Sequence, residues 1–426
     1  MTAPAAPTRL DPGAQGWMTR PEVIATFDAL AAVWPGDAPG PAARFVGGCV
    51  RNALLGQPVS DVDVATPLGP DAVLAALEAA GVRAVPTGIE HGTVTAVVEG
   101  HPVEVTSLRR DVESDGRRAV VAFTHDWVED SERRDFRFNA IYADPDGTLF
   151  DPQDGVADAL AGRVVFIGDP EARIREDYLR ILRFFRFRAW YGRGEADAAG
   201  LAACKALVKG MRELSAERVW QELKKLLAAP DPVPALDAMA GADVLEQVMP
   251  EVLALDLVRA LVVREGEEGW TPDPMLRVAA LIPRMQLVAA RLKRRLKLSN
   301  AEAERLESWA RQDANPRLFV GRSEAEMAAA VYPLDRRAAL DRARLAWALD
   351  AAQDETPVAE WRALIAFMET WEPPAFPVTG EDVIAAGVPK GPPVGAALKA
   401  LEKLWVRSGF ATSREQLLAV LPTIRL

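Results

Sequence analysis

The hydrophobic pattern of this 426-residue chain changes near residue 170, and this change constrains the fold more than any other feature. Before that point, short runs rich in β-branched residues alternate with glycines, as in HGTVTAVVEG and HPVEVTSL. After it, amphipathic segments follow one another, as in SAERVWQELKKLLAAP. Because alternation predicts strands and a period of about 3.6 predicts helices, we expect an α+β fold. A mixed sheet with helices should come first, and an all-helical remainder should follow it.

The composition excludes several classes of protein. Apolar residues make up 49% of the chain and charged residues 26%, which is typical of a folded globular protein. The two cysteines, Cys49 and Cys204, are too few for a disulfide scaffold or a four-thiolate zinc site. No uncharged apolar run approaches the roughly 18 residues of a membrane span, and the N-terminal segment lacks the apolar core of a secretory signal. We therefore expect a cytoplasmic protein.

The overall charge and the local charge point in opposite directions. A net charge of −11 argues against nucleic acid as a partner. Residues 284–297, however, contain six basic residues and no acid. Such a stretch can bind RNA phosphates, or it can simply be a solvated helix face. The candidate RNA-binding residues in it are Arg291, Lys293, Arg294 and Arg295.

Two aspartates, Asp61 and Asp63, lie two positions apart in the predicted strand 60–66. They should project from one face, where they can bridge two Mg²⁺ ions in a phosphoryl or nucleotidyl transfer. With 61 acids in 426 residues, chance gives roughly nine such pairs, so a solvated strand face is the alternative. Glu104 lies mid-strand between two valines, where a carboxylate needs a cation or water. It is a candidate third acid, or else an exposed position on an edge strand.

A glycine turn precedes the aspartate pair. Gly47 and Gly48 follow an apolar strand candidate and open a short predicted helix that carries Arg51. Bare backbone amides, a helix N-terminus and a guanidinium together suit a triphosphate. These three residues are therefore candidates for nucleotide binding.

The segment RRDFRFNAIYAD (133–144) combines arginines, an aspartate and aromatic residues. In a structural interpretation it is a helix start with an apolar core and solvated charges. In a functional interpretation, arginine contacts phosphate and aspartate accepts a hydrogen bond from the 2′-hydroxyl that only a ribonucleotide carries. The residues concerned are Arg134 and Asp135.

Asp177 and Arg180 lie three residues apart in a predicted long helix over 169–192, so their side chains should lie side by side. Such a pair can be a simple ion pair. It also presents an acceptor beside a donor, which complements the amino group and unprotonated ring nitrogen of cytosine and adenine. Uracil and guanine present an oxygen beside a ring N–H and would be refused. This segment can therefore select C and A without a nucleic acid template.

Seven segments, taken in order, resemble the motifs of the class II tRNA nucleotidyltransferase and bacterial poly(A) polymerase family. They cover about residues 44–230, and seven ordered motifs are far more specific than any one of them. Residues 379–405 resemble the tail of the same family. The seven segments are GGCVRNALLG, SDVDVAT, HGTVT, RRDFRFNA, DPQDG, REDYLRILR and SAERVWQELKKLL.

The resemblance implies a polymerase-β-like nucleotidyltransferase head, followed by an all-helical neck, body and tail. It implies that Asp61 and Asp63 hold two Mg²⁺ ions and that Glu104 is a third catalytic acid. It also implies contacts with the phosphates, ribose and base of a nucleotide. The residues implied for these contacts are Gly47, Gly48, Arg51, Arg134, Asp135, Glu176, Asp177, Arg180 and Arg183.

The family comparison also suggests four domains and two local departures. Asn52 stands where the family usually has aspartate, and Arg137 replaces a small hydroxyl residue. Residues 110–130 resemble a flexible loop, with Gly116 as a hinge candidate. The expected domains are the catalytic head (1–150), the neck with the nucleotide-selecting segment (151–235), the RNA-binding body (236–350) and the RNA-binding tail (351–426).

The predicted activity is the template-independent addition of CCA to the tRNA 3′ end, with CTP and ATP as substrates and two Mg²⁺ ions as cofactors. The expected partners are tRNA and these nucleotides, with neither a membrane nor a protein partner. A poly(A) polymerase, or a relative that adds only C or only A, would share the same motifs. A non-catalytic RNA-binding protein should have lost the aspartate pair, which is intact here.

Overall fold

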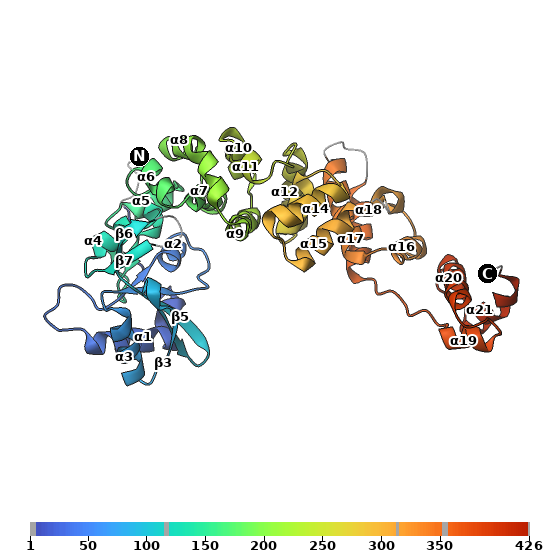
Figure 1. Cartoon of the computed structure of the whole chain (residues 1–426), viewed down its shortest axis with the longest axis horizontal. Helices are drawn as coiled ribbons and strands as arrows, with labels where there is room; N and C mark the ends of the chain where they lie inside the picture. Colours follow the sequence, from blue (N-terminus) through green and yellow to red (C-terminus); the bar gives the residue numbers. More distant parts are fainter. Residues whose placement is uncertain (1–5, 115–118, 312–314, 352–356, 425–426) are drawn as a thin grey trace. The chain divides into compact units, whose positions relative to one another are not determined.

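The chain folds into two compact units, Met1–Pro250 and Glu251–Leu426 (Figure 1). All strands among the described residues lie in the first unit, and the second is helical. This confirms the predicted α+β fold with a helical remainder. The computed structural model describes residues 6–114, 119–311, 315–351 and 357–424.

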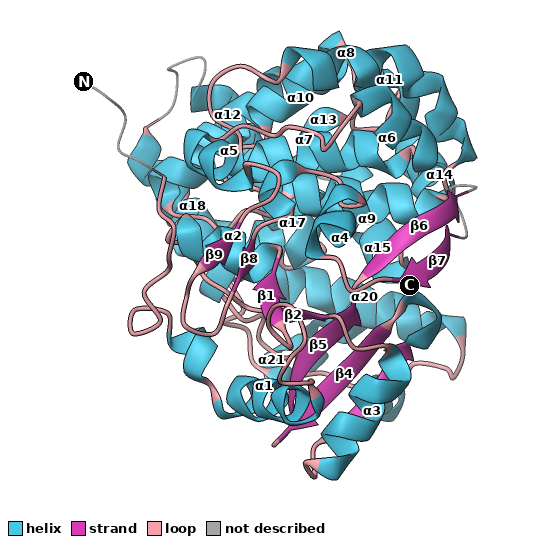
Figure 2. Ribbon diagram, turned by 90° about the vertical axis from the view of Figure 1, so that its left-hand side faces the viewer, coloured by secondary structure: helices cyan, strands magenta, loops and turns pink. Residues whose placement is uncertain are grey.

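Seven short strands form one mixed sheet in the first unit (Figure 2). Their order is β3-β4-β5-β2-β1-β8-β9. Strands β2 and β5 pair in parallel, whereas all other neighbours pair antiparallel. The strands are β1 (Arg44–Val46), β2 (Asp63–Thr66), β3 (Arg83–Gly88), β4 (Thr93–Val98), β5 (His101–Ser107), β8 (Tyr142–Ala143) and β9 (Leu149–Phe150).

Helices α1 (Pro21–Val33) and α3 (Pro70–Ala79) contact each other and pack against β4 and β5. Each begins with a proline, whose fixed φ and missing N–H suit the first helical position. Leu30 of α1 and Leu77 of α3 are fully buried. This core supports the central strands from one face, so that the residues at the strand ends are held in place.

Strands β6 (Arg109–Ser114) and β7 (Ala119–Phe123) form a separate two-stranded hairpin. Among the described residues, β7 pairs only with β6 and does not join the main sheet. The predicted hinge Gly116 lies outside the described residues.

Helix α4 (Trp127–Glu132) follows the hairpin. The Asp126 carboxylate accepts a hydrogen bond from the Val128 amide at 2.8 Å and so caps the helix N-terminus. The region predicted as a flexible loop, 110–130, therefore contains most of a hairpin and a capped helix among its described residues.

The predicted single helix over 169–192 is wrong, because the chain breaks it into α6 (Pro170–Glu176) and α7 (Leu179–Tyr191). Asp177 is extended at the break, with φ −156° and ψ 107°. Its carboxylate accepts a hydrogen bond from the Leu179 amide at 3.1 Å, which satisfies a free N–H at the start of α7. The apolar periodicity continues through the break, so the pattern alone does not reveal it.

The rest of the first unit is built from short helices. Asp151 precedes α5 (Gly155–Ala161), and its carboxylate accepts hydrogen bonds from the first two amides of the helix, those of Gly155 and Val156, each at 2.8 Å. A Cβ on Gly155 would lie 2.1 Å from the Arg137 carbonyl oxygen, so the DPQDG turn requires glycine there. The other helices are α2 (Gly48–Leu54), α8 (Ala198–Leu207), α9 (Ala216–Leu227), α10 (Val233–Gly241) and α11 (Val244–Val248).

The second unit contains two cores of buried aromatic and aliphatic side chains. One surrounds Trp347 and Trp361, and the other surrounds Leu401 and Trp405. No helix among the described residues is long and apolar enough to cross a membrane. The helices are α12 (Asp256–Glu268), α13 (Pro274–Leu281), α14 (Gln286–Leu296), α15 (Asn300–Ala310), α16 (Glu324–Val331), α17 (Arg336–Ala351), α18 (Val358–Thr370), α19 (Gly380–Ala385), α20 (Pro392–Arg407) and α21 (Arg414–Val420).

Short 3₁₀ helices complete both units. They are η1 (Gly16–Thr19), η2 (Ile89–His91), η3 (Arg137–Asn139), η4 (Val208–Glu213), η5 (Pro316–Phe319) and η6 (Leu421–Thr423).

Candidate active site

A polar cleft of about 500 Å³ in the first unit brings together most of the predicted site residues. Seven arginines and three aspartates line it, so its charge suits a polyanion such as a triphosphate. Of the residues predicted for catalysis and nucleotide binding, Asp61, Glu104 and Glu176 do not line it. The lining residues are Gly47, Gly48, Arg51, Asp63, Arg133, Arg134, Asp135, Asn139, Asp177, Leu179, Arg180, Arg183, Arg186, Phe187 and Arg218.

The glycine turn joins β1 to α2 at one side of the cleft. Gly47 adopts φ 70° and ψ −117°, which side-chain-bearing residues avoid. The Gly47 amide donates to the Ile141 carbonyl oxygen at 3.1 Å, so this tight turn is also fixed to the neighbouring chain. A Cβ built on Gly47 would lie 3.8 Å from Nη1 of Arg134. The bare turn therefore lies directly beside a guanidinium.

Arg51 is buried, and three neighbouring side chains bind its guanidinium. It donates from Nη2 to the Tyr191 hydroxyl at 2.8 Å, and its guanidinium lies 4.1 Å from the centre of that ring. It also donates to the Asn139 side chain, and to the amide oxygen of Asn52 at 3.0 Å. Burial lowers the pKa of Arg51, although Tyr191 counteracts this. Asn52 therefore keeps a hydrogen-bonding role without the charge of the family's usual aspartate.

Asp63 begins β2 and pairs in register with Glu104 of β5. Asp61 precedes the strand, contrary to the prediction that both aspartates lie within it, and its carboxylate accepts from the Ser60 hydroxyl at 3.1 Å. Burial, followed by the charge of Glu104, raises the pKa of Asp63 to about 6, while Arg134 acts in the opposite direction. Carboxylates that repel one another in this way are suited to a divalent cation.

A metal ion at Asp63 would need ligands beyond the protein. Among the described residues, no group of three or more Asp, Glu, His or Cys side chains could hold a metal ion. Mg²⁺ commonly binds one or two carboxylates together with substrate phosphates. The oxygen donors of Asp61 and Asp63, beside an arginine-rich cleft, fit that arrangement.

Asp135 is buried, and it orients other residues of the cleft. Its carboxylate accepts from the Asn139 side-chain amide at 2.9 Å and from Nε of Arg183 at 2.7 Å. Burial opposes ionisation, but Arg183 and Asn139 hold the pKa of Asp135 below its usual value. Asp135 thus lies where predicted, with part of its accepting capacity already used by Asn139 and Arg183.

Asp177 and Arg180 both line the cleft, and the Arg180 amide donates to the Asp177 carbonyl oxygen at 3.0 Å. Among the described residues, however, their side chains form no hydrogen bond with each other. Arg180 donates to the Glu176 carboxylate and, at 2.9 Å, to the Arg173 carbonyl oxygen. Asp177 accepts from Nη2 of Arg218 at 2.6 Å. The expected side-chain pair is therefore not formed, because Arg218 binds Asp177 and Glu176 binds Arg180 instead of lining the cleft.

The cleft also contains arginines that the sequence motifs did not predict. Arg186 lies one helical turn after Arg183 in α7, and it is ion-paired at 2.6 Å with the buried carboxylate of Glu222 in α9. Arg218 also comes from α9. The spacing of Arg183 and Arg186 was an available signal, because residues three apart share a helix face. Nothing in the sequence near Arg218 indicates that it reaches Asp177.

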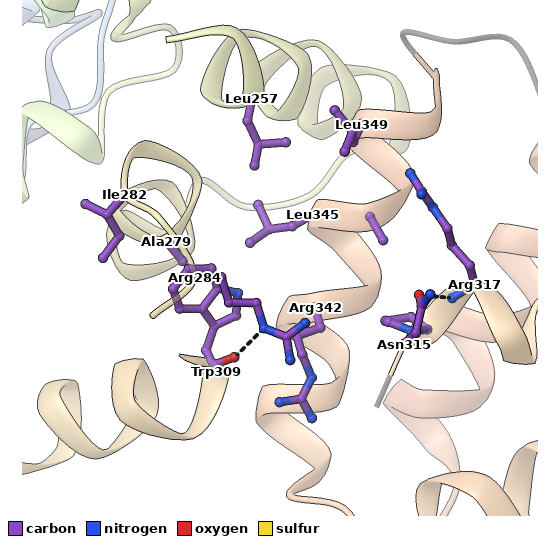
Figure 3. Close-up of a pocket in the computed structure, with 12 residues that line it drawn as sticks. Leu257, Ala279, Ile282, Arg284, Trp309, Asn315, Arg317, Arg342, Leu345 and Leu349 are labelled. Carbon is purple, nitrogen blue, oxygen red and sulfur yellow. Dashed lines mark hydrogen bonds between the residues drawn. The ribbon is translucent and has the colours of Figure 1, made fainter. Parts of the chain in front are cut away.

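A second pocket, of about 610 Å³, lies within the second unit (Figure 3). Leu257, Leu345 and Arg342 line it, and Nε of Arg284 donates to the Trp309 carbonyl oxygen at 3.1 Å. None of the described residues that line it is acidic. It therefore lacks the carboxylates of a metal-dependent active site.

The four predicted RNA-binding residues all lie on α14, and Lys293, Arg294 and Arg295 are in its last turn. Lys293 is 3.7 Å from the Glu307 carboxylate, and Arg295 is 3.2 Å from that of Glu251. Arg291 and Arg294 are exposed, with no ion pair to any residue that the structure describes. These two side chains remain available to phosphates.

A mixed sheet that carries paired carboxylates beside an arginine-lined cleft defines a nucleotidyltransferase head. Comparison with known families supports this class. Residues 43–165 match the family described as "Poly A polymerase head domain", and residues 197–255 match "Probable RNA and SrmB- binding site of polymerase A".

Relatives extend the likeness over most of the chain. A mouse protein named CCA tRNA nucleotidyltransferase 1, mitochondrial, is 34% identical over 394 residues, covering 88% of this chain and 85% of its own. The CCA-adding enzyme of Geobacillus thermodenitrificans is 40% identical over 204 residues, or 46% of this chain and 48% of its own. The solved structure of the Bacillus stearothermophilus CCA-adding enzyme with CTP has a TM-score of 0.71 at 26% identity, covering 95% of this chain and 98% of that one.

The chain belongs to the tRNA nucleotidyltransferase and poly(A) polymerase family. This confirms the family that the seven sequence motifs predicted.

Proposed function

We propose that this protein adds CCA to the 3′ end of tRNA from CTP and ATP without a nucleic acid template. The observation that carries the proposal is the single cleft in which Asp63 of the sheet meets Asp177 and Arg180 of the neck. One end offers charge for a triphosphate and its metal, and the other offers a donor and an acceptor for a base. The names of relatives from mouse and bacteria agree with this activity.

Asp61 and Asp63 would hold two Mg²⁺ ions, with Glu104 adding negative charge from the adjacent strand. When bound, such ions lower the pKa of the attacking 3′-hydroxyl and neutralise the leaving pyrophosphate. The protein's own residues position the reactants. Arg134 and Arg183 lie in the cleft to bind phosphates, together with Arg51 and the Gly47–Gly48 turn, and Asp135 orients Arg183 beside the ribose.

The base is chosen by hydrogen-bond polarity. Asp177 accepts from the exocyclic amino group of cytosine or adenine, and Arg180 donates to the neighbouring ring nitrogen. Glu176 and Arg218 position these two side chains. Uracil or guanine would place its carbonyl oxygen opposite the Asp177 carboxylate and its ring N–H opposite the Arg180 guanidinium. These groups cannot pair, and leaving them unpaired lowers the affinity for the nucleotide.

Purified protein, tRNA lacking its 3′ end, and the four nucleotides offered singly and in pairs test this function. CTP should be added first, ATP should follow only when CTP is present, and UTP and GTP should be excluded. A poly(A) polymerase would instead extend a CC-ended tRNA without limit when given ATP alone. A C-only or A-only enzyme would use one nucleotide whatever the tRNA end.

Asp63→Ala should abolish addition while leaving tRNA affinity within about twofold, because the substitution removes metal binding and not the RNA surface. Asp61→Ala should behave in the same way. Asp28→Ala, on an outer helix of the head, is the matched control and should keep full activity. Retained addition in both metal-site variants would contradict the assignment of Asp61 and Asp63 as metal ligands.

The four-part division into head (1–150), neck (151–235), body (236–350) and tail (351–426), with RNA bound by the body and tail, belongs to this proposal. We also propose a cytoplasmic location, although the mouse, human and zebrafish relatives are named as mitochondrial. Imaging of the tagged chain in its own cells tests the location, and a membrane-enclosed signal would refute it.

A further inference from the structure

Asp130 in α4 is a buried carboxylate outside the cleft, and its hydrogen bonds reach into it. The residue is 1% exposed. Its Oδ2 accepts from Nη2 of Arg134 at 2.9 Å and from the Tyr142 hydroxyl at 2.7 Å. Its Oδ1 accepts from Nε of Arg133 at 2.8 Å and from the Arg109 amide at 3.3 Å. Asp130 does not line the cleft, whereas Arg133 and Arg134 do.

A carboxylate buried to this degree stays charged only because donors surround it. Burial works against ionisation, but Arg134 and Arg133 outweigh it and hold the pKa of Asp130 well below its usual range. The charge is therefore permanent at physiological pH. Removing it would leave several buried donors without their acceptor.

The hydrogen bonds of Arg134 show what this charge does. Nε and Nη2 are turned toward Asp130, and Nε also lies 3.2 Å from the Tyr142 hydroxyl. The Arg134 carbonyl oxygen accepts from Arg173 at 2.8 Å. No described residue accepts a hydrogen bond from Nη1, which lies on the side of the Gly47 turn. One edge of the guanidinium is thus fixed, and the other faces the proposed phosphate site.

Asp130 also contacts the root of the β6–β7 hairpin. The Arg109 amide that it binds belongs to the first residue of β6. The opposite side of the root is closed by the Thr124 amide, which donates to the Leu108 carbonyl oxygen at 3.0 Å. A single carboxylate therefore joins the hairpin root to an arginine of the cleft.

We propose that Asp130 is a positioning residue for nucleotide binding, which acts by holding Arg134 with its free edge toward the triphosphate and by fixing the hairpin root to it. The inference rests on the proposed function, because it needs a nucleotide in the cleft. Asp130 touches no reacting atom. Its effect passes through Arg134, so it should alter the affinity for the phosphate and ribose portion that CTP and ATP share, and leave base choice unchanged.

Asp130→Asn tests this with nearly constant side-chain volume. The KM values for CTP and ATP should both rise about tenfold, the change expected when a charge-assisted hydrogen bond is no longer held in place. The preference for CTP over UTP should stay as in the wild type. The double variant Asp130→Asn/Arg134→Ala should be no worse than Arg134→Ala alone, because a residue that acts only through Arg134 adds nothing once Arg134 is gone.

Asp158→Asn is the matched control. Asp158 is also buried, at 2% exposed, and it accepts from Nε of Arg163 at 2.8 Å, but it does not line the cleft. A purely structural effect should lower Tm in both variants and leave both KM values near wild type. That result, or additive effects in the double variant, would overturn the inference.

Equilibrium binding of CTP to the folded wild-type protein separates the two claims. If the wild type binds CTP and Asp130→Asn binds it equally well, the positioning role is refuted and the proposed function stands. If the wild type binds no CTP, both are refuted. Weaker CTP binding by Asp130→Asn, at a folded fraction equal to that of Asp158→Asn, supports the positioning role.

Discussion

The side chain proposed to read the base is held by a residue outside its own helices. Asp177 lies at the break between α6 and α7, and its carboxylate receives one hydrogen bond from Leu179 and one from Arg218. Arg218 is on α9, 41 residues further along the chain. The direction of the Asp177 acceptor is therefore determined by tertiary packing.

Arg218→Ala should make nucleotide choice less strict, because Asp177 loses the partner that orients it. We expect misincorporation of UTP to rise about three- to tenfold, equivalent to the roughly 1 kcal/mol that one oriented charged hydrogen bond contributes. Arg180→Ala should have the larger effect, since it removes a group that binds the base itself. Single-nucleotide incorporation into CC-less tRNA measures both.

Arg212→Ala is the control for charge. Arg212 is exposed in η4 of the same unit and does not line the cleft. Equal misincorporation in Arg212→Ala and Arg218→Ala would show that net charge, and not the ion pair with Asp177, is responsible.

The break between α6 and α7 depends on a glycine in another element. Tyr178, at the break, packs its ring on Gly210 of η4, where a Cβ would lie 2.0 Å from Cε1 of that ring. An aromatic ring can approach the backbone this closely only where no side chain intervenes. The backbone geometry around Asp177 and Tyr178 thus requires a glycine at position 210, which is 32 residues after Tyr178.

Gly210→Ala should lower the free energy of unfolding by about 1–3 kcal/mol, because the new methyl group must displace the Tyr178 ring. It should also shift Asp177, and so reduce discrimination against UTP. Urea unfolding and the incorporation assay measure the two effects.

Gly241→Ala is the matched control, since a Cβ at this residue of α10 meets nothing within 4 Å. It should leave stability unchanged or raise it slightly. A Gly210→Ala variant as stable and as selective as Gly241→Ala would contradict the packing argument.

The sequence predicted those parts of the fold and site that depend on neighbours in the chain. The glycine turn, Asp63, Arg134 and Asp135 all lie in short motifs, and the cleft contains all of them. The helix break was missed because local propensity and apolar periodicity favour a continuous helix, whereas Tyr178 and Gly210 meet only in the folded chain. Tertiary packing of this kind leaves no periodic signal.

The whole chain carries a net charge of −11, yet its predicted partner is a polyanion. Most arginines near the cleft are paired with acids or aromatic rings, so they are positioned by the protein. Exposed and unpaired basic side chains, such as Arg291 and Arg294 among the described residues, can contribute long-range attraction. Affinity for tRNA should therefore depend on a few local positions and on salt.

Arg291→Ala/Arg294→Ala should weaken tRNA binding and reduce the slope of log affinity against log salt by about one for each phosphate that the protein no longer neutralises. CTP binding should not change, because these residues belong to the other unit. Filter binding across a salt series gives the slope.

Arg322→Ala is the matched control. It removes an exposed arginine that already pairs with Glu326 at 3.6 Å, and it should leave the slope unaltered. Identical slopes in all three proteins would exclude this helix from the RNA surface.

An enzyme that selects nucleotides with its own side chains can lose nucleotide selectivity without losing catalytic rate. The Asp177 carboxylate at the α6–α7 break is positioned by a few contacts with α9 and η4. Asp63, which would bind the metal ions, instead begins a strand inside a packed sheet. Warming loosens the least supported parts of a fold first. An enzyme built in this way should begin to make errors while it is still working at full speed.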